Sequence, residues 1–521
     1  MPSNAQLAQS SAVQAKAARL ERAGDLPGAL AVYEAGLAAS PNDVDLLAGL
    51  AALALRMGMP EASAGLWARV CEQAPDRLDA IDARAGALRA AGQFEHALAL
   101  LGAALDAHPT DARLWNSLGV AHTDKGDAAG ALACFEEALR LDGRLAAAAY
   151  NRGGALFDLG RLDEARTDFQ RARKLARKPL DAVTIDFAEA TRALAAGDLG
   201  AGWDAYEARL SRDWANPVVF TAPGRRWTPE APLAGKRLLV LAEQGLGDEV
   251  MFANLLPDVL EALRPNGRLA LAVEPRLVGL FQRSFPAADV SAHATEAANG
   301  RKRRFAPGLR EAASIDLWTP MASLNRRFRR TVGDFPATAG YLRPDPERIA
   351  HWRAWLGTGP AVGLTWRSGN LLGVRRREYP PLELWTPLLR TPGIRLVNLQ
   401  YGDCADELAA MSAAAGRPVD EPPGLDMRND LDDLAALCCA LDLVVSVPNA
   451  TGALAGACGA PLLMLSGPVA WPRLGTPAYP WYPQAGCLAA PRYGEWEPVM
   501  ARAAAFVAEL AGAGQARAAA G

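Results

Sequence analysis

The segment ARLWNSLGVAHTDKGDAAGALACFEEA, residues 112–138, carries the pattern that governs the N-terminal part of the chain. Its Gly126 belongs to a series of glycines spaced 34 residues apart, at positions 24, 58, 92, 126 and 160. An alanine follows the glycine by five residues, an aromatic by nine and a proline by seventeen, at Ala29, Ala97, Ala131, Ala165, Tyr33, Phe135, Phe169, Pro41, Pro75 and Pro109. Self-similarity at this period predicts a solenoid of helix–turn–helix units.

Each recurring position has a physical reason. A glycine can adopt a positive φ and end the first helix of a pair, and the alanine is small where the two helices cross. The aromatic side chain fills the gap toward the next unit, and the proline stops the second helix because it has no N–H to donate. A sixth, degenerate unit at Gly197, with Tyr206 nine residues on, breaks the spacing. We expect it to cap the stack and dock it to the next domain.

After Trp227 the pattern changes to alternating strands and helices. The apolar run 236–241 predicts a buried parallel strand, and the glycine-rich turn 245–248 and a helix follow it. Strand 268–273 and helix 274–285 continue the series. A second series begins with AVGLTWRSG at 361–369, followed by a helix near 382–389, strand 394–402, helix 431–441, strand 441–447, the turn 448–452, a small-residue helix and strand 461–467. This order predicts parallel sheets with ligands at the carboxyl ends of their strands.

Composition bounds the class of protein. The chain has 521 residues, more than one hydrophobic core usually holds, and a net charge of −3 that gives no indication of nucleic-acid or membrane binding. Its seven cysteines are scattered without a CxxC or Cys/His cluster, which predicts a reduced, cytoplasmic protein. The first twenty residues contain no apolar signal segment, and no run reaches the ~18 apolar residues of a membrane helix.

The turn Gly245–Asp248 is not diagnostic by itself. GxGD is not the GxGxxG of dinucleotide-binding proteins, and no GK[ST] follows, so a P-loop is also absent. An NAD-dependent enzyme is therefore not favoured.

Taken together, several segments resemble bacterial tetratricopeptide-repeat glycosyltransferases, which are similar to the heptosyltransferases and, in architecture, to the protein O-GlcNAc transferases. The closest likeness is to alphaproteobacterial flagellin glycosyltransferases. The repeats resemble the tetratricopeptide consensus over about residues 7–178. The other segments are EQGLGDEVMFANLLP, WRSG, the arginines before EYPPLELW, VNLQYGD and SVPNATGALAGACGAP…AWPRLGTPAYPWYP.

The resemblance implies an α-solenoid followed by an α/β domain of the GT-B fold, with two Rossmann-like lobes and a cleft between them. We expect a solenoid over 1–180, a degenerate repeat and linker over 181–234, an acceptor-side lobe over 235–343 and a nucleotide-sugar donor lobe over 344–521. The implied activity is inverting, metal-independent sugar transfer to hydroxyls of a protein that the repeat groove recruits, with flagellin as the suggested acceptor. No cofactor beyond the nucleotide-sugar co-substrate is expected.

The resemblance implies that Asp248 is the catalytic base. A base must reach the acceptor hydroxyl, and a loop at the carboxyl end of a strand provides that reach. The alternative is that Asp248 caps the following helix, a position that aspartate favours.

On the donor lobe, diphosphate requires positive charge or a helix N-terminus. The turn at 449–452 opens a helix of small residues, and the basic run 375–377 lies near the first strand, although such runs are more often solvated loops. Gln400 and Tyr401 end another strand on the same side and are expected to contact the base or ribose of the nucleotide. The predicted donor-binding residues are Arg367, Ser368, Arg377, Gln400, Tyr401, Asn449, Thr451 and Gly452.

The chain departs from the heptosyltransferase pattern, because Pro448 replaces an aspartate and Ala453 a histidine. None of the histidines, at 96, 108, 122, 293 and 351, is predicted to be a base. Asp430 and Asp432 spell DxD but begin a helix, so a cap is the favoured interpretation and no metal site is predicted. Most arginines of the clusters 301–304 and 326–330 are expected to be solvated, with steering of an acidic acceptor as the alternative. The aromatic run Trp471, Tyr479, Trp481 and Tyr482 is expected to pack in the core, with lining of the donor site as the alternative.

Two other functions stay open from the sequence. One is sugar transfer to lipopolysaccharide or another glycan, and the other is a non-catalytic repeat scaffold with a decayed transferase domain.

Overall fold

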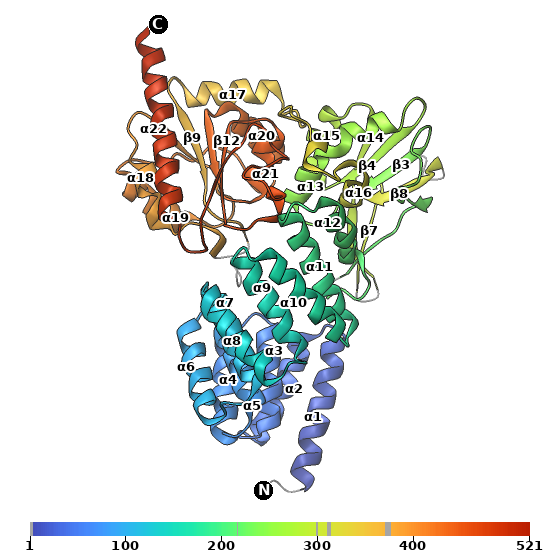
Figure 1. The fold of residues 1–521 in the computed structure, drawn as a ribbon, viewed down its shortest axis with the longest axis vertical. Coiled ribbons are helices and arrows are strands. Elements are labelled where there is room, and N and C mark those ends of the chain that lie inside the picture. The colour runs from blue at the N-terminus through green and yellow to red at the C-terminus, as the bar shows by residue number, and fades with distance from the viewer. Residues whose placement is uncertain (1–3, 216, 299–300, 310–313, 370–376, 521) are drawn as a thin grey trace. The chain divides into compact units, whose positions relative to one another are not determined.

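The computed structural model describes residues 4–215, 217–298, 301–309, 314–369 and 377–520. The chain divides into two compact units, each shown in Figure 1. Among the described residues, the first unit comprises the chain up to Leu159 and Gln170–Leu175, and the second comprises Gly160–Phe169, 176–369 and 377–520.

The first unit is a series of helices in which neighbours along the chain pack on one another. They are α1 Asn4–Arg22, α2 Leu26–Ala39, α3 Val44–Arg56, α4 Pro60–Gln73, α5 Leu78–Ala90, α6 Phe94–Ala107, α7 Ala112–Lys125, α8 Ala128–Leu141 and α9 Ala146–Asp158. The predicted helix–turn–helix repeat is confirmed, and every glycine of the series has a positive φ, between 73° and 94°. A Cβ on Gly119 would lie 2.5 Å from the Phe135 ring, so this aromatic packs directly against helix backbone.

The degenerate repeat predicted at Gly197 is a helix pair that belongs to the second unit. Helix α10, Leu162–Leu175, leads to α11, Pro179–Ala195, and to α12, Leu199–Tyr206, with Gly197 at a φ of +82° between the last two. The short 3₁₀ helix η1, Glu207–Leu210, continues α12.

The first parallel sheet has five strands in the order β2-β8-β3-β4-β5. They are β2 Arg225–Arg226, β8 Leu317–Pro320, β3 Arg237–Leu241, β4 Arg268–Val273 and β5 Ala288–Ala292. Leu238 and Val240 face helices, among them α13 Leu246–Phe252, α14 Leu256–Ala262 and α15 Val278–Ser284. Leu239 and Leu241 instead pack in a small cluster with Phe220. Phe220 belongs to a separate three-stranded sheet of β1 Val218–Phe220, β7 Arg301–Phe305 and β6 Ala294–Ala298.

The second parallel sheet has the order β10-β9-β11-β12-β13 and is covered by helices on both faces (Figure 1). Its strands are β9 Ala361–Thr365, β10 Arg395–Asn398, β11 Leu443–Ser446, β12 Leu462–Ser466 and β13 Gly486–Ala489. Val445 packs on the side of α18 Thr386–Leu389, α19 Ala405–Ala415 and α22 Glu497–Ala520. Val444 packs on the side of α17 Pro346–Leu356, α20 Leu431–Ala440 and α21 Ala450–Ala457.

An aromatic cluster joins α12 to both sheets. The Trp203 ring lies 6.2 Å from Phe252 of α13 and 6.1 Å from both Trp471 and Trp481. Tyr479, Trp481 and Tyr482 are at most 3% exposed, so core packing is confirmed for these aromatic residues.

One arginine of the basic clusters is not solvated. Arg329 is 1% exposed, and its guanidinium donates to the carbonyl and side-chain oxygens of Asn254 and to Asp258. Within the described residues, no helix combines the length and hydropathy that a bilayer crossing requires.

Candidate functional site

The second sheet reverses its strand order at β9, which lies between β10 and β11. Open parallel sheets bind ligands outside the carboxyl ends of their strands at such a reversal. The loop 366–369 follows β9 and the turn 447–449 follows β11, so the fold brings the predicted donor residues of these two segments together.

Asn449 ties the two loops to each other. Its side-chain nitrogen donates to Thr365 Oγ1 at 2.6 Å and to the Arg367 carbonyl at 3.0 Å. Its side-chain oxygen accepts from Gly452 N at 2.9 Å, which makes Asn449 the N-cap of α21. The residue that the sequence assigned to the donor therefore also holds the loop geometry.

Gln400 is buried and holds the loop after β9 through hydrogen bonds to its main chain. It is 1% exposed, and its Oε1 accepts from the main-chain nitrogens of Trp366 and Arg367, both at 3.0 Å. A contact between this amide and a nucleotide base or ribose would require these bonds to open. Tyr401 next to it uses its hydroxyl to accept from Gly369 N at 3.0 Å.

The start of α21 packs tightly on the end of β11. A Cβ on Gly452 would lie 2.3 Å from Ser446 Oγ, so only glycine fits at this position. Thr451 is 1% exposed, and among the described residues its hydroxyl has no hydrogen-bond partner. An unsatisfied buried hydroxyl is costly, so Thr451 is the polar side chain of this site whose role the fold does not explain.

The predicted phosphate-binding arginines have protein partners. Arg367 Nε donates to both carboxylate oxygens of Glu407, at 2.7 and 2.8 Å, and Nη2 donates to the Asp403 carbonyl at 2.6 Å. The Arg377 guanidinium lies over the Tyr493 ring at 4.2 Å. Ser368 is 8% exposed beside Arg367. Arg375 and Arg376, the rest of the basic run, lie outside the described residues.

Asp248 lies in the first turn of α13, directly after the glycine-rich turn. Its Oδ2 accepts from Gly245 N at 3.2 Å, so the helix-capping role is present. Burial raises the pKa of the Tyr206 and Tyr482 hydroxyls, and the Asp248 carboxylate raises both further. Asp248 thus lies within electrostatic reach of α12 and of the second sheet's aromatic segment, and its role as a base stays a prediction.

The Asp248 turn meets the donor turn. A Cβ on Gly247 would lie 3.5 Å from Ala450 Cα and 3.8 Å from Ala453 Cβ, an ordinary van der Waals contact. Helices α13 and α21 are in contact along this line. Ala453, where the resemblance leads us to expect a histidine, therefore lies at the junction of the two turns.

A buried ion pair at the first sheet was not predicted from the sequence. Arg209 of η1 donates from Nε and Nη2 to the two carboxylate oxygens of Glu243 at 2.9 and 2.7 Å. Glu243 lies two residues beyond the end of β3. The partners are 34 residues apart along the chain, and no local pattern links them.

A second buried pair lies at the carboxyl ends of β4 and β5. His293 Nε2 is 3.8 Å from Glu249 Oε2, with 8% and 4% of the side chains exposed. Glu249 Oε1 accepts from Glu274 N at 2.7 Å. Burial raises the pKa of Glu249, which His293 and Arg304 partly offset. The sequence predicts only a loop at His293 and does not indicate this contact, because Glu249 belongs to a distant helix.

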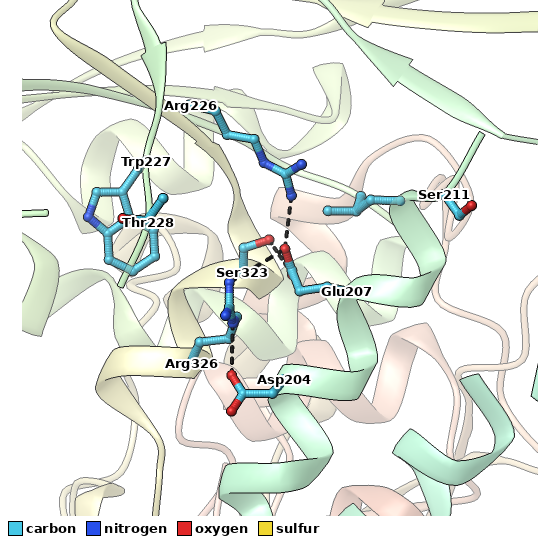
Figure 2. Close-up of a pocket in the computed structure, with 9 residues that line it drawn as sticks. Asp204, Glu207, Ser211, Arg226, Trp227, Thr228, Ser323 and Arg326 are labelled. Atoms are coloured by element: carbon cyan, nitrogen blue, oxygen red, sulfur yellow. Dashed lines mark hydrogen bonds and ion pairs between the residues drawn. The ribbon is translucent and has the colours of Figure 1, made fainter. Parts of the chain in front are cut away.

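A cavity of about 460 Å³ opens at the carboxyl ends of β2 and β8. Figure 2 shows Arg226 and Ser323 converging on Glu207, whose carboxylate accepts from Arg226 Nη2 at 2.8 Å and from Ser323 Oγ at 2.7 Å. Arg326 Nε lies 3.0 Å from Asp204 Oδ1 on the neighbouring wall. Because the walls come from three separate segments, no sequence pattern indicates this cavity.

Both aspartates of the DxD sequence have protein partners, and the predicted helix cap is present at Asp430. Asp430 is the N-cap of α20 and accepts from Asp433 N at 3.0 Å. It also accepts from Arg348, whereas Asp432 pairs with Arg283.

A comparison with protein-family models agrees with the repeat assignment. A tetratricopeptide-repeat family model matches residues 83–144 and 124–182. Among solved structures, a thermophilic TPR protein of Thermus thermophilus is 23% identical, with a TM-score of 0.31, over 36% of this chain and 99% of its own. MamA of Desulfovibrio magneticus is 20% identical, with a TM-score of 0.27, over 32% of this chain and 93% of its own.

A relative matches far more of the chain. Protein FlbA of Caulobacter vibrioides is 45% identical over 494 residues, which cover 94% of this chain and 83% of FlbA. The match spans the repeats and both parallel sheets. The chain therefore belongs to the family of Protein FlbA.

Proposed function

We propose that this chain is a glycosyltransferase that moves a sugar from a nucleotide-sugar donor to a hydroxyl of a protein acceptor. The observation that carries the proposal is the contact between the Asp248 turn and the start of α21, with Gly247 against Ala450. The turn that carries Asp248 thereby lies against the start of a helix at the strand reversal of the second sheet, and such a transfer can use both a carboxylate base and a helix N-terminus.

In this reaction the acceptor oxygen attacks the anomeric carbon of the sugar, and the bond from that carbon to the diphosphate oxygen breaks. The bonding electrons leave with the diphosphate, whose charge the N-terminus of α21 would stabilise. The acceptor proton passes to the Asp248 carboxylate. Attack opposite the leaving group inverts the anomeric centre.

The repeats are proposed to recruit the acceptor, because stacked helix pairs form extended binding surfaces. Asn116 of α7 and Asn151 of α9 lie on the first helices of successive repeats and are hydrogen-bonded at 2.9 Å. Their amides offer further donors and acceptors for a bound polypeptide. Flagellin is the acceptor that the sequence resemblance suggests.

A non-catalytic scaffold is the second candidate function. Arg367 favours it, because its guanidinium is bound to Glu407 and to the Asp403 carbonyl. Pro448 and Ala453 favour it as well, since they replace the aspartate and histidine of the heptosyltransferase pattern.

The deciding experiment incubates the full chain with flagellin and with each of a panel of nucleotide sugars. We expect one donor to give a glycosylated acceptor by intact-protein mass spectrometry, with release of nucleoside diphosphate. Donor binding without transfer from any sugar would establish the scaffold instead.

Recruitment is tested by Asn116→Ala combined with Asn151→Ala. We expect a higher KM for the acceptor protein and an unchanged affinity for the donor. Asn42→Ala, in an exposed interhelical loop of the same unit, is the matched control and should change neither. An unchanged acceptor KM in the double variant would remove this surface from the proposal.

A further inference from the structure

Arg209 is almost completely buried and makes an unusually full set of hydrogen bonds. Only 2% of its side chain is exposed. Besides the two bonds to Glu243, Nη2 donates to Ser323 Oγ at 3.1 Å, and Nη1 donates to the Tyr206 carbonyl at 2.8 Å and to Glu207 Oε1 at 2.9 Å. A planar guanidinium bound on all sides in this way fixes the relative positions of its partners.

The partners of Arg209 lie where the first sheet reverses its strand order. The chain runs from β3 outward to β4 and β5, and then returns to place β8 on the other side of β3. Glu243 follows β3 and Ser323 follows β8. Glu243 Oε1 also accepts from Ala322 N at 2.9 Å, so the two strand ends are joined directly as well as through Arg209.

The turn that carries Asp248 begins at this ion pair. Gln244, immediately after Glu243, has a φ of +65°, which is uncommon for a residue other than glycine. Such a conformation persists where its surroundings over-determine it. Glu243 on one side is held by Arg209, and Gly245 on the other donates its N–H to Asp248.

We propose that Arg209, which lies in η1 directly after the degenerate helix pair, is a positioning residue that holds the Glu243–Asp248 turn in place against the start of α21. Its consequence for turnover rests on the proposed function, whereas its effect on the turn does not. The helix pair α11–α12, which leads into η1, then contributes to the site of the α/β unit in addition to ending the repeat stack.

The test separates positioning from stability with three variants of the full chain: Arg209→Met, Glu243→Gln and the two combined. Arg209→Met leaves the buried Glu243 carboxylate without its guanidinium, and Glu243→Gln leaves the guanidinium with Glu207 as its carboxylate partner, so each single change should lower the melting temperature. The combined change removes both groups and should regain much of that loss. Loss of the positioning contact should speed amide exchange over residues 243–248, and in the combined variant we expect exchange at least about tenfold faster than in wild type. We also expect a kcat lower by on the order of 10²-fold, which is the effect of misplacing a reacting group by about 1 Å.

An ion pair with a buried arginine elsewhere in the same unit supplies the control. Arg192 donates to Glu189 at 2.7 and 2.8 Å within α11, and only 4% of its side chain is exposed. Arg192→Met should lower the melting temperature without changing amide exchange at 243–248.

The positioning role is overturned if kcat and amide exchange in the combined variant return to wild-type values together with the melting temperature. It is also overturned if exchange at 243–248 is unchanged in Arg209→Met. If the wild type transfers no sugar from any donor, the proposed function fails, and the exchange measurement alone decides the role of Arg209.

Discussion

The two parallel sheets of the second unit both reverse their strand order beside their first strand. They differ in which segments supply the polar groups at that reversal. At the second sheet, the polar groups come from the sheet's own loops, with Gln400 and Asn449 as their centre. At the first sheet, Arg209 comes from η1, which continues α12 and precedes the sheet in the chain. The strand reversal of the first sheet therefore depends on a polar residue from a segment that its strand–helix pattern does not include, whereas the polar groups at the reversal of the second sheet come from its own loops.

The largest effect is expected from a change at the first sheet, in the Glu243–Asp248 turn that Arg209 supports. Asp248→Asn keeps the shape and the acceptor for Gly245 N–H, but an amide cannot take up the acceptor proton. Turnover should fall by on the order of 10²–10⁴, the usual contribution of a general base. Donor affinity and melting temperature should stay near wild type.

Asp248→Ala separates the two roles of this carboxylate. It removes the hydrogen bond from Gly245 as well, at roughly 0.5–1.5 kcal/mol of stability. Transfer rate and melting temperature are measured for both variants. Near-wild-type transfer by the Asn variant would leave Asp248 as a helix cap and place the base elsewhere.

The corresponding change at the second sheet is Asn449→Ala. It deletes the cap of α21 and the bridge to the loop after β9, so we expect a loss of about 1–3 kcal/mol in the free energy of unfolding. Donor affinity should fall with it, because the loop and the helix start separate. Chemical denaturation and donor titration provide the two measurements.

A helix cap outside the site is the control for Asn449. Asp127 accepts from Gly130 N at 2.9 Å in the repeats, and Asp127→Ala should cost ~1 kcal/mol without any change in donor affinity. If Asn449→Ala behaves in the same way, the second sheet's polar network serves only the fold.

The contrast between the sheets also explains what the sequence could predict. Spacing identified the repeats because Gly126 and its counterparts impose the same turn at a fixed period. Arg367, Ser368 and Asn449 were all assigned to donor binding, because parallel sheets bind ligands at the carboxyl ends of their strands. The first pattern can be recognised from residue spacing along the chain, and the second from the order of strands and loops.

The contacts that sequence patterns do not reveal are made by residues far apart in the chain. Arg209 contacts Ser323, 114 positions away. The sequence places Arg209 in the predicted segment 181–234 of degenerate repeat and linker, which gives no indication of this contact. Arg329 belongs to a run of arginines, yet it is buried against Asn254, 75 positions away. The engagement of Arg367 by Glu407 likewise depends on how α19 packs, which no motif specifies.

A pH-dependent difference should appear at the carboxyl ends of the first sheet, where Glu249 is buried. Burial raises the pKa of Glu249 in the folded protein, so the native state holds this proton more tightly than the unfolded chain does. The resulting stability is present at low pH and is lost as pH rises through the folded pKa. The charged or titratable side chains that face Glu249 are His293, Arg276 and Arg304, and its Oε1 accepts from the main-chain nitrogen of Glu274.

Glu249→Gln removes this ionisation. We expect the variant to gain stability relative to wild type as pH rises, with the difference smallest in acid. Urea denaturation at several pH values gives the free energy of unfolding for both proteins. A difference that shrinks with rising pH would contradict the assignment of Glu249 as the titrating group.

The smallest expected effect is that of EDTA on transfer, which should be less than about twofold, because the leaving diphosphate is expected to be stabilised by the helix N-terminus. The carboxylates of the DxD sequence already have partners. Asp430 caps α20 and accepts from Arg348 at 3.1 Å, and Asp432 pairs with Arg283 of α15. Asp432→Asn removes the charge that a metal would need and should leave transfer unchanged. A contradicting result would be that EDTA abolishes transfer, that Mg²⁺ or Mn²⁺ restores it, and that Asp432→Asn prevents the restoration. These aspartates would then bind metal, and the donor side of the second sheet would need a metal ion in addition to the polar groups of its own loops.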